Sequence, residues 1–305
     1  MISSSDKEYL HLLKLALTGS LYEESYWRYA RLPAREEFSL RHPARALRAI
    51  IKKTVLSLAK KEGLEVLRRG PADPAARDQG KDWPFVGLTM VGFKRLDNIA
   101  ECVRRIAESR IPGDFVECGV WRGGSAMFMK AVADRYGLAD RSVWLADSFE
   151  GMPKPVLAED LTSPNYDLST IGELRSSLEG VRQSFQQLGL LDDRVKFLKG
   201  WFKDTLPSAP VERIALLRLD GDLYESTRDA LRALYQKVSS GGFVIVDDYF
   251  DWVPCRKAVD EFRAERNITS PIERIDWTGA YWQVGTYESA GSRALEGAGS
   301  RGHAG

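Results

Sequence analysis

The chain has few of the residues that several common enzyme chemistries require. Among its 305 residues only three are histidines and three are cysteines, and no two cysteines form a Cys-x-x-Cys pair. A histidine-rich metal site, a zinc site and a Ser-His-Asp triad are therefore disfavoured. Cysteines that are odd in number and widely spaced fit buried thiols in a reducing cytoplasm better than disulfides.

The sequence also lacks a long apolar run and an excess of charge of either sign. No apolar stretch approaches the roughly 20 residues needed to cross a bilayer. The first residues do not resemble a signal peptide, because no basic segment opens them and Lys14 interrupts the run 10–17. With 44 basic and 43 acidic residues the net charge is +1, which argues against a general nucleic-acid binder. We expect a cytoplasmic protein with no membrane span and no nucleic-acid partner.

What the chain does contain, from Trp83 onward, is an alternation of apolar strand-like runs with helical stretches. The strand candidates are residues 114–119, 143–146, 194–198, 213–219 and 242–246, and the helical stretches are 95–108, 125–136, 170–187, 224–238 and 256–265. This alternation predicts an α/β fold, a doubly wound parallel sheet with helices on both faces. Residues 272–276 and 280–286 are expected to close it as an antiparallel hairpin.

Before residue 83 the pattern is helical. A first helix is predicted over residues 6–18, and a second opens at Pro43 and runs to about residue 69, where Gly63 could interrupt it. The second helix has a basic face, which indicates either a solvated surface or a contact with an anionic surface or partner. Residues 70–82 are expected to be a loop or mobile linker. The predicted units are a helical extension or lid with its linker (1–82), a catalytic domain (83–288) and a disordered tail (289–305).

Two acidic clusters follow apolar runs of this predicted sheet. Asp220 and Asp222 come after the run 214–219, and Asp247 and Asp248 come after the run 243–246. Ligands of open α/β sheets bind at the carboxyl ends of the strands. Four carboxylates brought together there would repel one another, so a hard cation such as Mg²⁺ is expected between them. The alternative for Asp220 and Asp222 is a role in a turn or helix cap, and the alternative for Asp247 and Asp248 is an ordinary loop after a strand.

A cofactor site is predicted upstream of these acids. The turn from Glu117 to Ser125 is rich in glycine, which lets the backbone approach a ligand closely, but it is neither G-x-G-x-x-G nor a P-loop. Asp147 ends the second strand candidate, where an acid can accept hydrogen bonds from ribose hydroxyls. Trp201 could lie against an adenine, although tryptophans are more often core residues. Together these features indicate a nucleoside-containing cofactor, with a structural turn and a capping Asp147 as the alternatives.

In several stretches the sequence resembles the macrocin O-methyltransferase (TylF/MycF-type) family of S-adenosylmethionine- and Mg²⁺-dependent class I methyltransferases. The matching stretches are residues 87–92, 116–124, 146–153, 200–207, 219–227 and 247–249. They occur in order across about two-thirds of the chain, and residues 9–22 also resemble the family's first helix.

This resemblance implies a Rossmann-like class I methyltransferase sheet and methylation of a hydroxyl, often on a deoxysugar of a natural product such as an antibiotic. The implied magnesium ligands are Asp220, Asp247 and Asp248, and Asp222 resembles the acid that takes the hydroxyl proton. The implied contacts to S-adenosylmethionine are Thr89, Met90, Glu117, Gly119 and Ser125 at the amino-acid end, Asp147 at the ribose, and Ser148, Ser177 and Trp201 toward the adenine. A small hydroxylated acceptor and a homo-oligomer are also implied.

Other functions remain open at this point. A phenol or catechol O-methyltransferase would use the same metal arrangement, and a glycosyltransferase or phosphatase could be built on the D-x-D of Asp220 and Asp222. A non-catalytic cofactor-binding protein is a third alternative, which the intact set of carboxylates disfavours. The stretch 43–82 is longer than the family's usual N-terminal region, so the acceptor does not follow from the resemblance.

Overall fold

The computed structural model describes residues 2–21, 27–29, 43–64, 66–70, 73–162 and 166–285. A seven-stranded sheet forms the centre of the molecule. Its strands are β3 (Asp114–Cys118), β4 (Val143–Asp147), β5 (Val195–Lys199), β6 (Ile214–Leu219), β7 (Val238–Val246), β8 (Glu273–Arg274) and β9 (Ala280–Gln283). Their order is β5-β4-β3-β6-β7-β9-β8. The first five are parallel, and β9 and β8 extend the sheet as an antiparallel hairpin. The predicted doubly wound sheet with a closing hairpin is confirmed.

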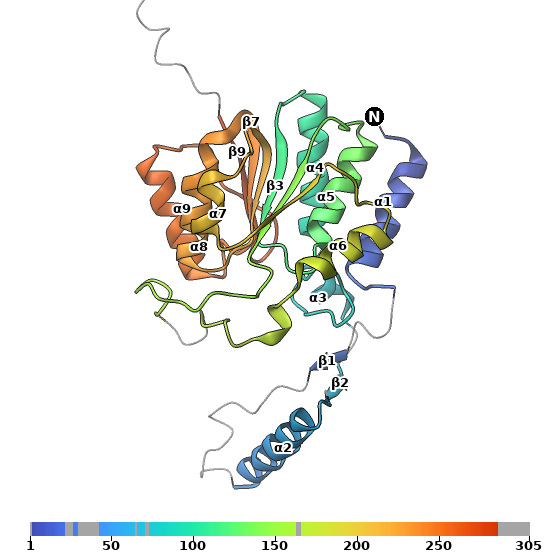
Figure 1. Ribbon diagram of the computed structural model, residues 1–305, viewed down its shortest axis with the longest axis vertical. Helices are drawn as coiled ribbons and strands as arrows, with labels where there is room; N and C mark the ends of the chain where they lie inside the picture. The colour runs from blue at the N-terminus through green and yellow to red at the C-terminus, as the bar shows by residue number, and fades with distance from the viewer. Residues whose placement is uncertain are drawn as a thin grey trace, which may run out of the picture.

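Helices cover both faces of this sheet (Figure 1). One face carries α1 (Ser4–Leu17), α4 (Phe93–Glu108), α5 (Gly124–Arg135) and α6 (Leu178–Gln187), and the other carries α7 (Phe202–Thr205), α8 (Tyr224–Leu234) and α9 (Val253–Glu265). Successive strand residues point to opposite faces. Phe115 and Leu216 therefore join the core beneath α4 and α5, and Val116 and Leu217 join the core beneath α8 and α9. Burial on both faces is the reason that these strands read as continuous apolar runs.

The first helix belongs to the same core. Ser3 caps α1 through a capping box, in which its hydroxyl accepts from the Asp6 amide and the Asp6 carboxylate accepts from the Ser3 amide. Leu10, Leu13 and Leu17 are then buried against the α5 side of the domain. The predicted helix over residues 6–18 is confirmed.

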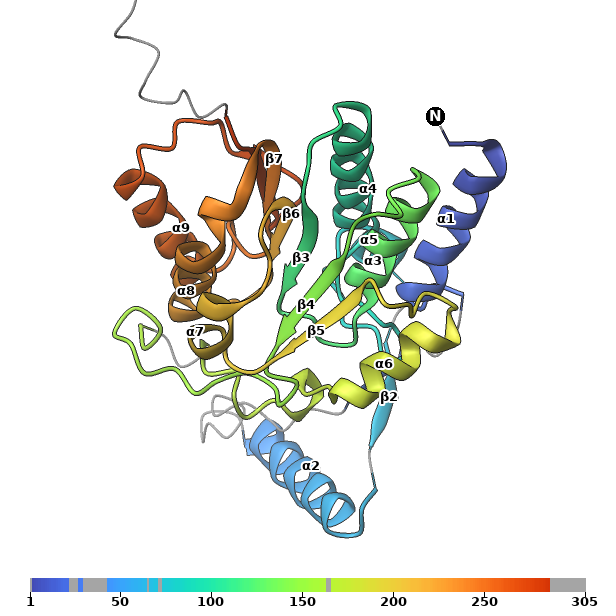
Figure 2. The ribbon, with the colours of Figure 1, turned by 45° about the horizontal axis from the view of Figure 1, so that its top comes forward.

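A second part of the N-terminal region lies outside this domain. It contains α2 (Pro43–Lys61) and the short antiparallel pair β1 (Trp27–Tyr29) and β2 (Leu67–Arg69). Figures 1 and 2 show α2 standing away from the sheet, on the side where the parallel strands have their carboxyl ends. The expectation that the helix continues to residue 69 was wrong. Gly63 adopts a left-handed φ of +70°, and the Leu64 amide then bonds back to the Ala59 carbonyl, which ends the helix.

Two other predicted segments also differ. Residues 70–82 are not a plain linker, because they contain α3 (Pro74–Asp78), which Asp73 caps and Pro74 opens. The helix predicted over residues 170–187 begins only at Leu178. Ser177 caps α6 by accepting from the Gly180 amide, and a separate 3₁₀ turn (Gly172–Leu174) precedes it.

The remaining helices and strands are displaced by a few residues from their predicted bounds. β7 begins at Val238 instead of Gly242, and α8 accordingly ends at Leu234. Among the described residues no helix combines the length and the hydropathy that crossing a bilayer would require. The domain boundary at residue 82 stays a prediction, and the tail 289–305 lies outside the described residues.

Candidate active site

The acidic residues that follow β6 and β7 meet at one edge of the sheet. In the parallel pairing of these strands Leu219 lies opposite Val246, so the acids after each strand become neighbours. Asp220, Asp222 and Asp248 each offer a carboxylate oxygen, and these oxygens all lie within 4.8 Å of one another. Among the described residues, the buried Oδ2 of Asp248 has no hydrogen-bond partner. A half-buried group of carboxylates with an unpartnered buried oxygen fits a hard divalent cation.

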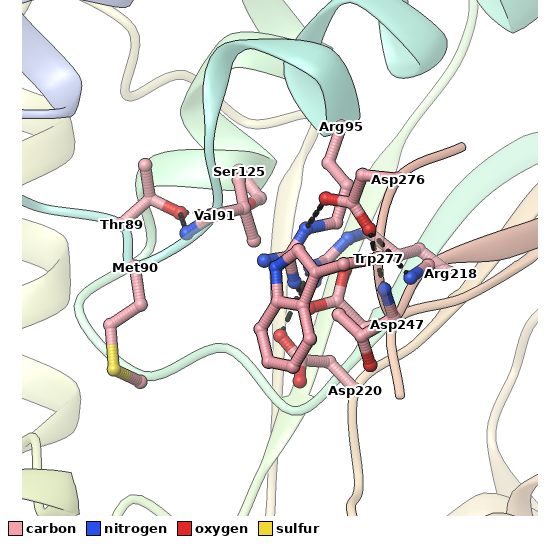
Figure 3. A network of polar contacts seen from close by, with 12 residues as sticks. Thr89, Met90, Val91, Arg95, Ser125, Arg218, Asp220, Asp247, Asp276 and Trp277 are labelled. Carbon is pink, nitrogen blue, oxygen red and sulfur yellow. Dashed lines mark hydrogen bonds and ion pairs between the residues drawn. The ribbon is translucent and has the colours of Figure 1, made fainter. Parts of the chain in front are cut away.

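Asp247 does not belong to this group of three. Its Oδ1 accepts from Arg218 Nη2 at 2.5 Å, and its Oδ2 accepts from Arg95 Nη1 (Figure 3). Both arginines are buried, Arg218 on β6 and Arg95 on α4. Asp247 would therefore bind a cation only with lone pairs that these two arginines leave unused.

The two arginines also organise the acids around them. Arg218 donates to Glu117 Oε1 at 2.7 Å and lies 3.0 Å from Asp220 Oδ2. Arg95 donates through Nε to Asp276 Oδ2 at 2.9 Å. Four of six neighbouring carboxyl groups thus contact the two guanidinium groups, the other two, Asp222 and Asp248, lie beside Asp220, and acids remain in excess. The acids are Glu117, Asp220, Asp222, Asp247, Asp248 and Asp276.

This excess of buried acids changes their protonation. Burial, followed by the charge of Asp247, raises the pKa of Asp220 to about 6. Burial, followed by the charge of Asp220, raises the pKa of Asp222 to about 8. Burial and the neighbouring acids also raise the pKa of Asp248 well above its ordinary value. A bound cation would favour the ionised forms and oppose these shifts.

A cavity of about 320 Å³ extends from the acids toward the ends of β4 and β5. Its lining includes Gly119, Asp147, Ser148, Trp201 and Asp220. The structure therefore brings four of the predicted cofactor residues together with one predicted metal ligand. The turn after β3 admits only glycine at position 119, because φ is +89° and a Cβ would lie 1.8 Å from the Asp220 carbonyl oxygen.

Asp147 is held firmly at the end of β4. Its Oδ2 accepts from the Val120 amide and its Oδ1 from the Phe149 amide, each at 2.7 Å. Burial raises the pKa of Asp147, and these amide hydrogen bonds oppose that shift. The carboxylate links the turn after β3 to the loop after β4, in the position where an acid can accept from a ribose.

Residues 6–284 match the family described as Macrocin-O-methyltransferase (TylF). The chain belongs to this macrocin O-methyltransferase family. It is 50% identical over 229 residues to the 8-demethyl-8-(2,3-dimethoxy-alpha-L-rhamnosyl)-tetracenomycin-C 4'-O-methyltransferase of Streptomyces olivaceus, covering 74% of this chain and 86% of the relative. It is 46% identical over 212 residues to the mycinamicin III 3''-O-methyltransferase of Micromonospora griseorubida, covering 68% and 83%.

A solved structure agrees with this assignment. The O-methyltransferase NovP superimposes with a TM-score of 0.74 at 39% identity, covering 92% of this chain and all of NovP. This macrocin O-methyltransferase family member is therefore an O-methyltransferase with the Rossmann-like class I fold, and that fold indicates S-adenosylmethionine as its methyl donor. The glycosyltransferase and phosphatase alternatives are excluded.

The other predicted cofactor residues of this family member lie outside the cavity lining. Thr89 and Ser125 are buried, lie near each other in Figure 3 and are joined by a hydroxyl hydrogen bond of 3.0 Å. The Met90 carbonyl accepts from Arg77 at 2.7 Å. Glu117 is fully buried behind the turn, where Arg218 holds it. Ser177 caps α6 with its hydroxyl. The roles of all these residues toward the cofactor stay predictions.

Arg95, Arg218 and Asp276 were not predicted from the sequence as part of the site. Arg218 left a signal, because it is the one charged residue in the apolar run 214–219 and is followed directly by a cluster of acids. Arg95 and Asp276 left none, since they are separated by 181 residues and meet only when α4 packs beside the closing hairpin.

Proposed function

We propose that this chain transfers a methyl group from S-adenosylmethionine to a sugar hydroxyl of a glycosylated natural product, in a magnesium-dependent reaction. The observation that carries the proposal is the half-buried group Asp220, Asp222 and Asp248, of which Asp220 lines the same cavity as Asp147 and Trp201. Such a site can hold a hydroxylated acceptor between a cation and a nucleoside cofactor. The name of the Streptomyces olivaceus relative, which includes a rhamnosyl group, supports a sugar as acceptor.

The acids at the strand ends divide into metal ligands and a base. Asp220 and Asp248 would hold the magnesium ion, and Asp247 would join them through a lone pair that its two arginines leave unused. When bound, the ion would lower the pKa of the acceptor hydroxyl and restrict its orientation. Arg218 holds Asp220 and Asp247 in position, and Arg95 holds Asp247 from its other side.

Asp222 would accept the proton of the acceptor hydroxyl. An ordinary carboxylate is a weak base at neutral pH. Burial raises the pKa of Asp222 to about 8 when no cation is bound, and a cation opposes that shift, so proton transfer to Asp222 depends mainly on the lowered pKa of the acceptor hydroxyl. Its φ of +53° turns the chain immediately after Asp220, and both carboxylates remain on the same side of the turn. The protein must also align the two reactants, because methyl transfer from a sulfonium requires the attacking oxygen to lie in line with the methyl carbon and the leaving sulfur.

The cofactor would lie in the cavity between these acids and Trp201. Asp147 would bind the ribose hydroxyls, and Ser148 and Trp201 would lie toward the adenine. The methionine end would reach the turn at Gly119, where the backbone permits close approach.

Two measurements test the proposal in sequence. Calorimetry with S-adenosylhomocysteine should show binding, and its absence would contradict the cofactor assignment. Labelled S-adenosylmethionine is then offered with deoxysugar-bearing acceptors and, separately, with catechols. We expect label on the glycosylated acceptors, loss of transfer with EDTA and recovery with Mg²⁺. Label on catechols alone would contradict the sugar assignment, and transfer that persists in EDTA would contradict the magnesium site.

Single substitutions separate the roles of the acids. Asp222→Asn should reduce turnover by about 10²–10⁴-fold, as expected for loss of a general base, while S-adenosylhomocysteine affinity is retained. Asp248→Asn should weaken the response to Mg²⁺. Asp251→Asn is the matched control, because Asp251 is an exposed acid only three residues from Asp248. Unchanged turnover in Asp222→Asn would exclude Asp222 as the base.

A further inference from the structure

The closing hairpin of β8 and β9 holds the residues that follow β7. From its turn, residues 275–279, the Thr278 carbonyl accepts from the Phe250 amide at 2.8 Å. Arg274 of the same hairpin lies over the Phe250 ring, with its guanidinium carbon 3.4 Å from the ring centroid. Phe250 comes two residues after Asp248. The hairpin therefore restrains the segment that carries the acids after β7.

Asp276 lies in this turn, and its side chain is fully buried. Its Oδ1 accepts from the amides of Thr278 and Gly279, at 2.9 and 2.7 Å. Its Oδ2 accepts from Arg95 Nε at 2.9 Å. The stem of Arg95 passes close to the turn, since a Cβ added at Gly279 would lie 3.1 Å from Arg95 Cδ. Because the amides fix the carboxylate, the turn also determines the direction of Arg95.

Arg95 connects the turn to the candidate metal site. While its Nε is held by Asp276, its Nη1 donates to Asp247 Oδ2, and Arg218 occupies the other oxygen of Asp247 (Figure 3). All of these side chains are buried. Two connections thus join the hairpin to the acids after β7, the backbone hydrogen bond at Phe250 and the chain of side chains from Asp276 through Arg95 to Asp247.

We propose that Asp276 is a positioning residue of the magnesium site. It acts through Arg95, which it holds in the direction from which Arg95 binds Asp247. Its negative charge also compensates the guanidinium, so Arg95 can restrain Asp247 without adding net positive charge beside the ion. Partners that hold metal ligands in place typically change metal affinity or activity by about 10–100-fold when they are removed. This inference rests on the magnesium site proposed above.

Binding of Mn²⁺ to the protein loaded with S-adenosylhomocysteine tests the proposal. Carboxylates that suit Mg²⁺ also suit Mn²⁺, which electron paramagnetic resonance detects directly. Asp276→Asn keeps the size of the side chain and an oxygen for the turn amides, but removes the charge that faces Arg95. We expect the affinity for Mn²⁺ to fall about 10–100-fold, with the affinity for S-adenosylhomocysteine unchanged.

Asp114→Asn is the matched control. Asp114 likewise accepts from a backbone amide and a side-chain N–H, those of Ser142 and Trp144, at 3.0 and 2.8 Å. It lies at the start of β3, whereas the candidate metal site lies at the carboxyl ends of the strands. Its replacement removes the same charge and should leave the affinity for Mn²⁺ unchanged.

A double variant separates the positioning role from an effect of charge alone. Arg95→Met/Asp276→Asn removes one positive and one negative group, so the net charge around the site equals that of the wild type. We expect its affinity for Mn²⁺ to stay at least about tenfold below that of the wild type. It also keeps the test valid if Asp276→Asn fails to fold, because replacing both partners of a buried ion pair leaves neither of them charged and unpaired.

The outcomes distinguish this inference from the proposed function. Wild-type affinity for Mn²⁺ in the double variant would overturn the positioning role. A lower Tm of Asp276→Asn with unchanged affinity for Mn²⁺ would also overturn it, because Asp276 would then serve stability alone. Failure of the wild-type protein to bind Mn²⁺ would overturn the proposed magnesium site, and this inference with it.

Discussion

Replacing Arg218 by methionine should remove much of the stability of the central sheet. The guanidinium of Arg218 is 1% exposed, and it lies 2.7 Å from Glu117, 3.0 Å from Asp220 and 2.5 Å from Asp247. Methionine is similar in length but uncharged, so Arg218→Met leaves these three carboxyls without that partner. The volume of the core changes little, and the effect is therefore mainly electrostatic.

The size of the loss follows from the burial of the group. Breaking a buried ion pair by removing one partner costs about 3–5 kcal/mol. In a domain of this size 1 kcal/mol lowers Tm by about 2–4 °C, so the expected decrease is roughly 6–20 °C. The decrease should be smaller near pH 5 than near pH 8, because the unpaired carboxyls, whose pKa values rise further in the folded state, can take up protons at the lower pH.

Thermal and urea unfolding across this pH range provide the measurement. The matched control is Arg232→Met on α8, an exposed arginine whose partner Glu265 lies at 3.4 Å. Such surface pairs contribute about 0–1 kcal/mol. The double variant Glu117→Gln/Arg218→Met should recover part of the stability, since it removes one of the stranded acids. A decrease no larger than that of the control, or one that does not depend on pH, would refute this account of Arg218.

Three further changes test other parts of the structure. Gly119→Ala should lower both the stability of the protein and its affinity for S-adenosylhomocysteine, because the added Cβ would lie 1.8 Å from the Asp220 carbonyl oxygen. Gly137→Ala is the control for backbone strain, because Gly137 has a similar positive φ but no atom within 4 Å of the added Cβ. Glu117→Gln should flatten the pH dependence of unfolding, because burial raises the pKa of Glu117 from 4.5 to about 8. Stability from that group is complete below 4.5 and is lost as pH rises through 8, so equal slopes in the variant and the wild type would contradict the shift. Asp160→Ala should cost about 1–2 kcal/mol in urea unfolding, since Asp160 accepts from the first amides of α8 as a cap supplied by a distant loop; a loss below 0.5 kcal/mol would show the cap to be dispensable.

The sequence allowed the sheet and the place of the acids to be predicted because both depend on local pattern. Apolar runs of five or six residues that end in aspartate identify buried parallel strands, and parallel pairing then brings Asp220 and Asp248 to one edge. The ends of helices were predicted less well, because a single residue can determine where a helix begins or ends. Gly63 ended α2, and Ser177 started α6 later than its helical pattern suggested.

The electrostatic support of the site could not be predicted in the same way. Asp247 was predicted as a metal ligand, which stays a prediction; its engagement by Arg95 depends on the packing of α4 against the sheet, which no local pattern specifies. Glu117 lies one residue before Cys118 and two before Gly119, yet it faces Arg218 behind the turn instead of the cavity. Side-chain direction at such positions is determined by partners distant in the sequence.

The segment between α1 and α3 is fixed to the sheet domain at both of its ends. The end of α1 is fixed by its own contact, since the Leu17 carbonyl accepts from the amides of Leu88 and Thr89. The return is fixed at α3, where Arg77 binds the Met90 carbonyl. The segment that carries α2 thus lies between two anchored points. We expect changes in its length or polarity to leave the spacing of the acids and of the cofactor turn unchanged.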